Sequence, residues 1–164
     1  MLSESAQQAL SDQLREELYS GYLYLAMSAY FESAALPGCA RWMRAQAQEE
    51  LAHAMRFFDF VCDRGGRVRL DALAAPPAEF PSPLAAFEMA LEHEQKVTAS
   101  IHRLYAGAVE QQDYPSQVFL QWFVNEQVEE EKSVSEIVET LRRVGDRGHA
   151  LVALDRELGK READ

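Results

Sequence analysis

The chain has 164 residues, of which 48% are hydrophobic, and its net charge at pH 7 is -11. This length and composition exclude a disordered chain and predict a single folded domain over residues 1–164. The negative charge argues against nucleic acid as a partner, because its phosphates would be repelled. It is compatible with attraction of cations, but such a charge more often serves only to keep a helical protein soluble.

Two features indicate a cytoplasmic protein that does not act at a membrane. Residues 1–8 lack the basic and apolar segments of a secretory signal, and no apolar run reaches the roughly 18 residues of a membrane-spanning helix. The two cysteines, Cys39 and Cys62, form neither a C-x-x-C motif nor a disulfide framework. Free cysteines are typical of a reducing compartment.

Periodic apolar residues predict a first helix over residues 5–35 and a second over about 40–63. Ser5 and Gln8 are expected to form a capping box at the start of the first helix, and Gly65-Gly66 should end the second. Residues 67–82 include three prolines and show no helical periodicity, so we expect a loop there. The apolar stripe of the first helix comprises Leu10, Leu14, Leu18, Leu25 and Ala29.

Ser82 followed by Pro83 predicts the start of a third helix, which runs to about residue 112. A fourth helix should cover about 115–144 and end at Gly145, and a short fifth should cover about 147–158. No segment shows the alternation expected of a strand. The chain is therefore predicted to be all-α.

The lengths of the connections indicate how the helices are arranged. Helices 1 and 2, and helices 3 and 4, are joined tightly and should be antiparallel neighbours. A helix of about 25 residues is about 38 Å long, whereas an extended loop of about 16 residues can reach about 53 Å. The loop over 67–82 can therefore travel the length of the bundle. This predicts a four-helix bundle with one long crossover between helices 2 and 3, plus a short C-terminal helix.

Each long helix carries a carboxylate near its middle. The first has Glu17, the second has Glu50 and His53 in an E-x-x-H motif, and the third has Glu94. The fourth has an acidic run that includes Glu130. The E-x-x-H spacing places Glu50 and His53 one turn apart on the same face of the helix, where both can reach one metal ion.

An E-x-x-H motif by itself is more often an exposed pair, and an acidic run is more often a solvated face. One carboxylate at a comparable height in each of four helices is a stronger pattern. Converging carboxylates with no basic partner imply a bound cation or protonation. Carboxylate oxygen and imidazole nitrogen together suit iron, manganese or zinc.

Four segments make the chain resemble bacterial non-haem ferritins over essentially its whole length. They are ELYS over 17–20, AQEELAH over 47–53, QDYP over 112–115, and FLQWFVNEQ over 119–127 running into EEEK over 129–132. The resemblance implies the ferritin-like form of the predicted bundle. It also implies a protein that oxidises Fe(II) with oxygen or peroxide and stores the ferric mineral in a hollow shell of 24 subunits with octahedral symmetry.

The resemblance also implies the roles of individual residues at a di-iron ferroxidase centre. One iron would be held by Glu17, Glu50 and His53. The second would be held by Glu94, Glu130 and a bridging Glu50. Gln127 would lie beside the pair, and Tyr24 would hydrogen-bond a ligand carboxylate or supply an electron. A third iron site would be formed by Glu49, Glu126, Glu129 and the shared Glu130.

Two positions distinguish the chain from haem-binding and oxygenase relatives. Those relatives usually carry a second E-x-x-H motif on the fourth helix, whereas this chain has Gln127-Val-Glu-Glu130 there. Residue 52 is Ala rather than the methionine that ligates haem in bacterioferritins. We therefore expect iron and no haem.

Two alternatives stay open at this point. One is a rubrerythrin-like di-iron peroxidase that lacks its electron-transfer domain. The other is an acidic helical-bundle interaction protein that binds no metal.

Overall fold

The computed structural model describes residues 2–145 and 148–161, and this part of the chain is helical without strands. Four long helices pack side by side, and a short fifth helix follows them. The helices are α1 (Glu4–Ser33), α2 (Pro37–Asp63), α3 (Pro83–Glu110), α4 (Tyr114–Val144) and α5 (Gly148–Leu158). This confirms the predicted all-α bundle with a short C-terminal helix.

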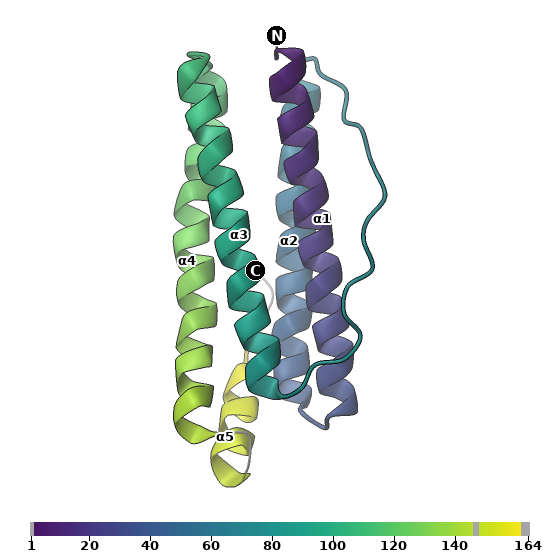
Figure 1. The fold of residues 1–164 in the computed structure, drawn as a ribbon, viewed down its shortest axis with the longest axis vertical. Coiled ribbons are helices and arrows are strands. Elements are labelled where there is room, and N and C mark those ends of the chain that lie inside the picture. Colours follow the sequence, from purple (N-terminus) through teal and green to yellow (C-terminus); the bar gives the residue numbers. More distant parts are fainter. Residues whose placement is uncertain (1, 146–147, 162–164) are drawn as a thin grey trace.

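The connection between α2 and α3 runs along the outside of the bundle from one end to the other (Figure 1). It leaves α2 and α3 parallel, whereas the tight connections make α1 antiparallel to α2 and α3 antiparallel to α4. The predicted long crossover is therefore confirmed. All four long helices run the length of the bundle, so their midpoints lie at a similar height (Figure 1).

Some helix ends differ from the prediction. The N-cap of α1 is Ser3, whose Oγ accepts a hydrogen bond from the Ala6 amide, so the expected capping box at Ser5 and Gln8 is wrong. The second helix begins at Pro37 rather than near residue 40, because proline is well suited to the first helical turn. The predicted start of the fifth helix at residue 147 lies outside the described residues.

Other helix ends agree with the prediction. Ser82 caps α3 by accepting a hydrogen bond from the Ala85 amide at 3.0 Å. Gly65 and Gly145 follow the ends of α2 and α4 with φ of 72°, a conformation that is easy only for glycine. These glycines set where α2 and α4 stop.

The predicted apolar stripe of α1 is only partly buried. Leu10 and Leu14 are buried, but Leu25 is 49% exposed and Ala29 is exposed as well. Successive steps of four residues overshoot a full turn by about 40° each, so Ala29 is rotated about 100° from Leu10. Further along α1, the buried apolar positions are instead Leu23, Tyr24, Met27 and Phe31.

The apolar core is divided into two clusters. One contains Phe31 and Phe87 and fills the end of the bundle near the α1–α2 turn. The other contains Phe57 and Phe123 and fills the opposite end. On every long helix the residues of the two clusters are separated by the segment that carries the predicted metal ligands. The polar side chains therefore form a layer between the two apolar clusters.

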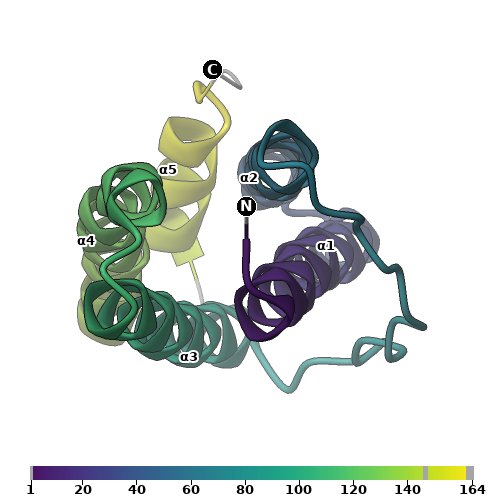
Figure 2. The same cartoon turned by 90° about the horizontal axis from the view of Figure 1, so that it is seen from above.

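The short helix α5 packs against α2 and α4 (Figure 2). The carboxylate of Asp155 accepts a hydrogen bond from the Cys39 amide at 2.8 Å, in the first turn of α2. Gly38 makes this close approach possible, because a Cβ atom at that position would lie 1.6 Å from the carbonyl oxygen of Asp155. These contacts between α5 and the start of α2 hold the C-terminal half of α5 in place, so they determine where the chain continues after the helix.

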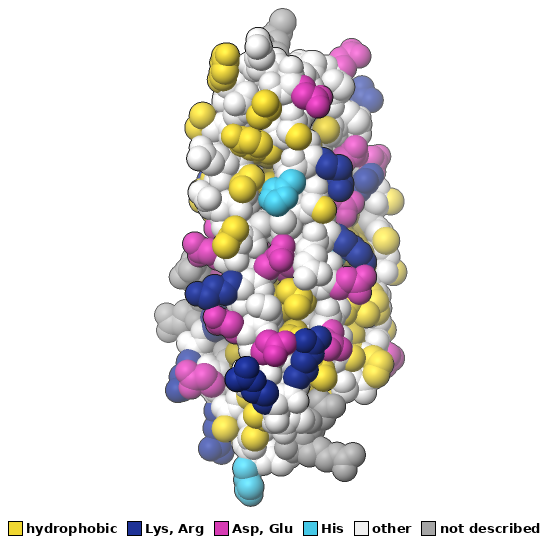
Figure 3. Space-filling view, turned by 60° about the vertical axis from the view of Figure 1, so that its left-hand side comes forward, with side chains coloured by type: hydrophobic (Ala, Val, Ile, Leu, Met, Phe, Trp, Pro, Cys, Tyr) yellow, Lys and Arg dark blue, Asp and Glu magenta, His cyan; other side chains and the backbone are white. Residues whose placement is uncertain are grey.

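Acidic and basic side chains are interspersed on the face of the molecule drawn in Figure 3. On this face the negative net charge does not form one continuous acidic patch. Among the described residues, no helix combines the length and the apolar character needed to cross a membrane.

We predict that Gly38→Ala displaces α5 and lowers the free energy of unfolding by about 1–3 kcal/mol, because the new methyl group overlaps the Asp155 backbone. The control is Gly107→Ala in α3, where the methyl group meets open space and should stabilise the protein by about 0.5–1 kcal/mol. Thermal denaturation measures both changes. Equal effects of the two substitutions would contradict the proposed packing of α5.

Candidate metal centre

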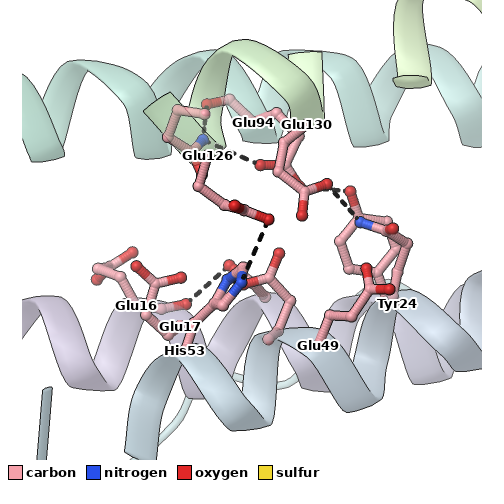
Figure 4. A network of polar contacts seen from close by, with 12 residues as sticks. Glu16, Glu17, Tyr24, Glu49, His53, Glu94, Glu126 and Glu130 are labelled. Atoms are coloured by element: carbon pink, nitrogen blue, oxygen red, sulfur yellow. Dashed lines mark hydrogen bonds and ion pairs between the residues drawn. The ribbon is translucent and has the colours of Figure 1, made fainter. Parts of the chain in front are cut away.

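The polar layer at mid-bundle contains one buried carboxylate from each long helix (Figure 4). Glu17, Glu50, Glu94 and Glu130 are 1%, 2%, 0% and 5% exposed. In the close-up, Glu94 and Glu130 point from the α3–α4 pair toward Glu17 and His53 on the α1–α2 pair. The structure thus brings the predicted carboxylates into one buried space.

Three ligand atoms form a compact group on the α1–α2 side. One atom each from Glu17, Glu50 and His53 lies within 4.8 Å of the other two. Nδ1 of His53 is 3.2 Å from Oε2 of Glu50, as expected for residues one turn apart. This group corresponds to the first predicted iron site.

The second group of ligand atoms differs from the predicted set. Atoms from His53, Glu126 and Glu130 lie within 4.8 Å of one another, and Nε2 of His53 is 3.9 Å from Oε1 of Glu126. Glu94 belongs to neither group. Its two carboxylate oxygens are engaged by Tyr24 and Gln127, which hold it at the edge of the space.

Burial of these groups changes their pKa values. Burial raises the pKa of Glu17 to about 7, and burial together with the charge of Glu94 raises the pKa of Glu130 to about 8. Burial and the neighbouring carboxylates also raise the pKa of Glu50, and burial raises that of Glu94. Carboxylates that lose water and repel one another hold protons or a cation more tightly than exposed ones do.

His53 is shifted in the opposite direction. Burial, helped by the charge of Arg56, lowers its pKa to about 4, so the imidazole is neutral at pH 7. A neutral imidazole can offer a nitrogen lone pair to a metal ion. Among the described residues, Oε2 of Glu17 is also buried without a hydrogen-bond partner. These donors fit a hard divalent cation.

A second layer of hydrogen bonds orients the carboxylates. Gln13 donates to Oε1 of Glu17 at 2.8 Å and accepts from Ser100 at 2.6 Å. Gln46 donates to Oε2 of Glu130 at 2.8 Å. Neither glutamine was among the predicted site residues. Gln13 precedes Glu17 by four residues, and that spacing is a local signal for its contact. Gln46 reaches Glu130 from another helix, so no local spacing predicts its contact.

Tyr24 and Gln127 both contact Glu94. The Tyr24 hydroxyl donates to Oε1 of Glu94 at 2.5 Å. Nε2 of Gln127 lies 3.2 Å from both Oε2 of Glu94 and Oγ1 of Thr98. Burial and the charge of Glu94 raise the pKa of Tyr24 well above its usual value, so the phenol stays protonated and remains a donor.

The residues predicted to form a third site line a cleft of about 680 Å³ that adjoins His53 and Glu130. Glu126 and Glu129 border it from α4, and Glu49 borders it from α2. Glu129 is exposed. Glu49 is paired with Arg161, whose Nη2 is 2.6 Å from Oε2 of the carboxylate. This arginine was not among the predicted site residues. We call this space the accessory cleft.

We predict that the metal-free protein becomes less stable as the pH rises from 6.5 to 8. The pKa values of Glu17 and Glu130 are higher in the folded than in the unfolded chain, so the folded state binds more protons in this range and rising pH favours unfolding. His53 and His93, with pKa values lowered to about 4, oppose this trend only below about pH 6.5.

Melting temperatures measured in this range, with and without Zn²⁺, test the prediction. Zn²⁺ should reverse the trend because it replaces the protons, and Glu17→Gln should flatten the slope of the metal-free protein. A melting temperature that rises with pH in the absence of metal would contradict the assignment.

Comparison with known proteins places this site in context. Residues 7–144 match the family model described as a ferritin-like domain. A bacterial non-heme ferritin of Bacteroides fragilis is 40% identical over 98% of this chain and all of its own length. A bacterial non-heme ferritin of Escherichia coli O157:H7 is 39% identical over 96% of each chain.

Solved structures agree with the sequence comparison. An open pore ferritin from the hyperthermophilic archaeon Archaeoglobus fulgidus superimposes with a TM-score of 0.98 at 52% identity, covering 99% of this chain and 100% of that one. An archaeal ferritin described as humanized gives a TM-score of 0.99 at 50% identity, covering 100% of this chain and 99% of that one. The chain therefore belongs to the ferritin-like domain family.

Proposed function

We propose that this protein stores iron, and that it oxidises Fe(II) to Fe(III) at the buried layer of carboxylates before storage. The observation that carries the proposal is the convergence of four buried carboxylates and one neutral histidine from four helices. The relatives described above, two of them named bacterial non-heme ferritins, match nearly the whole chain and support iron as the metal.

The first Fe(II) ion is assigned to Glu17, Glu50 and His53, whose ligand atoms already lie within 4.8 Å of one another. The second is assigned to Glu94, Glu130 and a bridging Glu50. This second set requires the Glu94 carboxylate to turn from Tyr24 and Gln127 toward the metal. The attraction of a dication for buried carboxylates is the driving force for that rotation.

The ligand types favour oxidation. Carboxylate oxygens are hard, negatively charged donors and stabilise Fe(III) more than Fe(II). Each iron gives up one electron, so two neighbouring ions together supply the two electrons that reduce oxygen or peroxide. The role of the protein is to hold the pair, to exclude bulk water with the flanking apolar clusters, and to release ferric product for storage.

Tyr24 and Gln127 are assigned supporting roles. Tyr24 donates to Glu94 and lies close enough to the centre to supply an electron. Gln127 connects Glu94 to Thr98 and orients the carboxylate or a water molecule beside it. Glu49, Glu126 and Glu129, with Glu130 shared, are assigned to a third iron in the accessory cleft.

Storage requires an enclosed volume that one bundle does not have, so we further propose that 24 subunits assemble into a hollow shell. The rubrerythrin-like alternative is not favoured, because the ferritins described above align with this chain along almost their whole length. The interaction-protein alternative does not account for the buried, mutually repelling carboxylates.

The size of the particle separates the proposal from the peroxidase alternative. Subunits of 18.5 kDa should assemble into a particle of about 444 kDa, whereas a small oligomer would be far lighter. Light scattering coupled to gel filtration measures this mass. A mass of a dimer or tetramer at micromolar concentration would contradict the shell.

We predict that Glu50→Ala and His53→Ala abolish the fast phase of Fe(II) oxidation. Each substitution removes a ligand of the first ion, and Glu50 also bridges to the second. The measurement is near-ultraviolet absorbance after aerobic addition of Fe(II), which should rise rapidly and saturate at a few irons per subunit in the unaltered protein.

Glu92→Ala is the matched control, because Glu92 is exposed on α3 and pairs with Lys96 away from the centre. It should oxidise Fe(II) at the unaltered rate. Oxidation no faster than in buffer by the unaltered protein would overturn the proposed function, and a full fast phase in both ligand variants would overturn the assigned site.

A further inference from the structure

The chain that follows α5 enters the accessory cleft. The carbonyl oxygen of Gly159 accepts a hydrogen bond from Nη1 of Arg41 at 2.9 Å. Two residues later, Nη2 of Arg161 donates to Oε2 of Glu49 at 2.6 Å. We call residues 159–161 the tail segment. It connects the docked helix α5 to a carboxylate assigned to the third iron.

The contact between Arg161 and Glu49 is partly buried. The side chain of Arg161 is 26% exposed and that of Glu49 is 16% exposed. The guanidinium carbon also lies 4.7 Å from the ring centroid of Trp42, in the position of a cation–π contact. Charge-assisted hydrogen bonds of this kind are stronger than hydrogen bonds between neutral groups. The guanidinium therefore has a defined place in the cleft.

The cleft that receives this cation is otherwise acidic toward α4. Glu126, Glu129 and Glu130 line it together with Glu49 and His53. A second arginine, Arg56, also lines it from α2 and lies over the ring of Trp122. The guanidinium supplies positive charge where a metal ion would supply it, and it occupies an oxygen of Glu49 that the metal would need. Arg161 and a third metal ion are therefore alternative partners for the same carboxylate.

We propose that Arg161 is a built-in competitor of the accessory metal ion, seated on Glu49 when that site is free and displaced when a divalent cation binds. The inference rests on the proposed function, because it takes the accessory cleft as a metal site. Its new element is that the C-terminal tail segment sets the affinity of that site.

The docking of α5 makes this competition effective. The Asp155 carboxylate accepts a hydrogen bond from the Cys39 amide, which holds α5 against α2. Arg161 lies only three positions after Leu158, the last residue of α5. The guanidinium is therefore held near Glu49 at a high effective concentration. Displacing it requires movement of the tail segment alone, while α5 stays in place.

This arrangement keeps the accessory site weaker than the buried pair of sites. Metal ions fill the pair first, and a further ion must displace the guanidinium before it binds Glu49. When that ion leaves, Arg161 returns and closes the site again. The tail segment thereby favours passage of iron through the cleft over its retention there.

Calorimetric titration of the assembled, metal-free protein with Zn²⁺, which does not change oxidation state, tests the proposal. The unaltered protein should show tight binding at the buried pair and weaker binding of a further ion. Arg161→Ala should tighten the weaker step about fivefold and leave the tight steps unchanged. Arg161→Lys keeps the positive charge and should lie nearer to the unaltered protein.

Two further variants distinguish competition from a general structural effect. Lys160→Ala removes an exposed neighbouring cation that pairs with Glu157, and it should leave every step unchanged. Asp155→Ala loosens α5 and frees Arg161 without replacing any residue that lines the cleft, so it should tighten the weaker step as Arg161→Ala does. Adding Glu49→Gln to Arg161→Ala should abolish that step.

Hydrogen exchange supplies a readout independent of affinity. Filling the weaker site with Zn²⁺ should speed amide exchange in residues 159–161 of the unaltered protein, but should have no such effect in Arg161→Ala. Zn²⁺ that fails to bind even the buried pair would count against the proposed function. If Zn²⁺ fills the buried pair but the weaker step in Arg161→Ala is unchanged, weakened or absent, the proposed competition is wrong and the proposed function is unaffected.

Discussion

The arrangement of this bundle depends on the burial of four carboxylates in one layer. Glu17, Glu50, Glu94 and Glu130 are each at most 5% exposed. Such a layer is costly without compensation, because each carboxylate loses its hydration and repels the others. The raised pKa values of these groups express that cost. A bound dication compensates for the lost hydration and removes the repulsion between the carboxylates. The unfavourable free energy of the metal-free layer therefore increases the affinity of the layer for a metal ion.

The rest of the fold serves to place this layer. The crossover sets α2 and α3 parallel, and the similar lengths of the four helices bring their midpoints to one height. Two apolar clusters on either side of the layer provide the stability that the polar groups do not. Gln13 holds Glu17 from one turn away on α1, and Gln46 on α2 holds Glu130 of α4. The tail segment after α5 holds a carboxylate of the accessory cleft in the same way, because Arg161 donates a hydrogen bond to Glu49.

Much of this was predictable from the sequence, because the relevant signals are local and periodic. The helices, the crossover and the presence of one carboxylate at a similar height in each long helix followed from spacing and from helix-breaking residues. Other features depend on distant contacts. The pairing of Arg161 with Glu49 joins residues 112 apart in sequence, and the engagement of Glu94 by Tyr24 and Gln127 depends on side-chain rotamers. The exposure of Leu25 reflects rotation accumulated along α1, which a stripe of leucines does not reveal.

The most direct test of the account is the position of bound iron. Crystals soaked with Fe(II) under anaerobic conditions can be examined by anomalous diffraction at the iron absorption edge. Two peaks are expected in the buried layer, one bounded by Glu17, Glu50 and His53 and the other by Glu50, Glu94 and Glu130. Iron bound only at the surface of the bundle, with this layer free of anomalous signal, would contradict it.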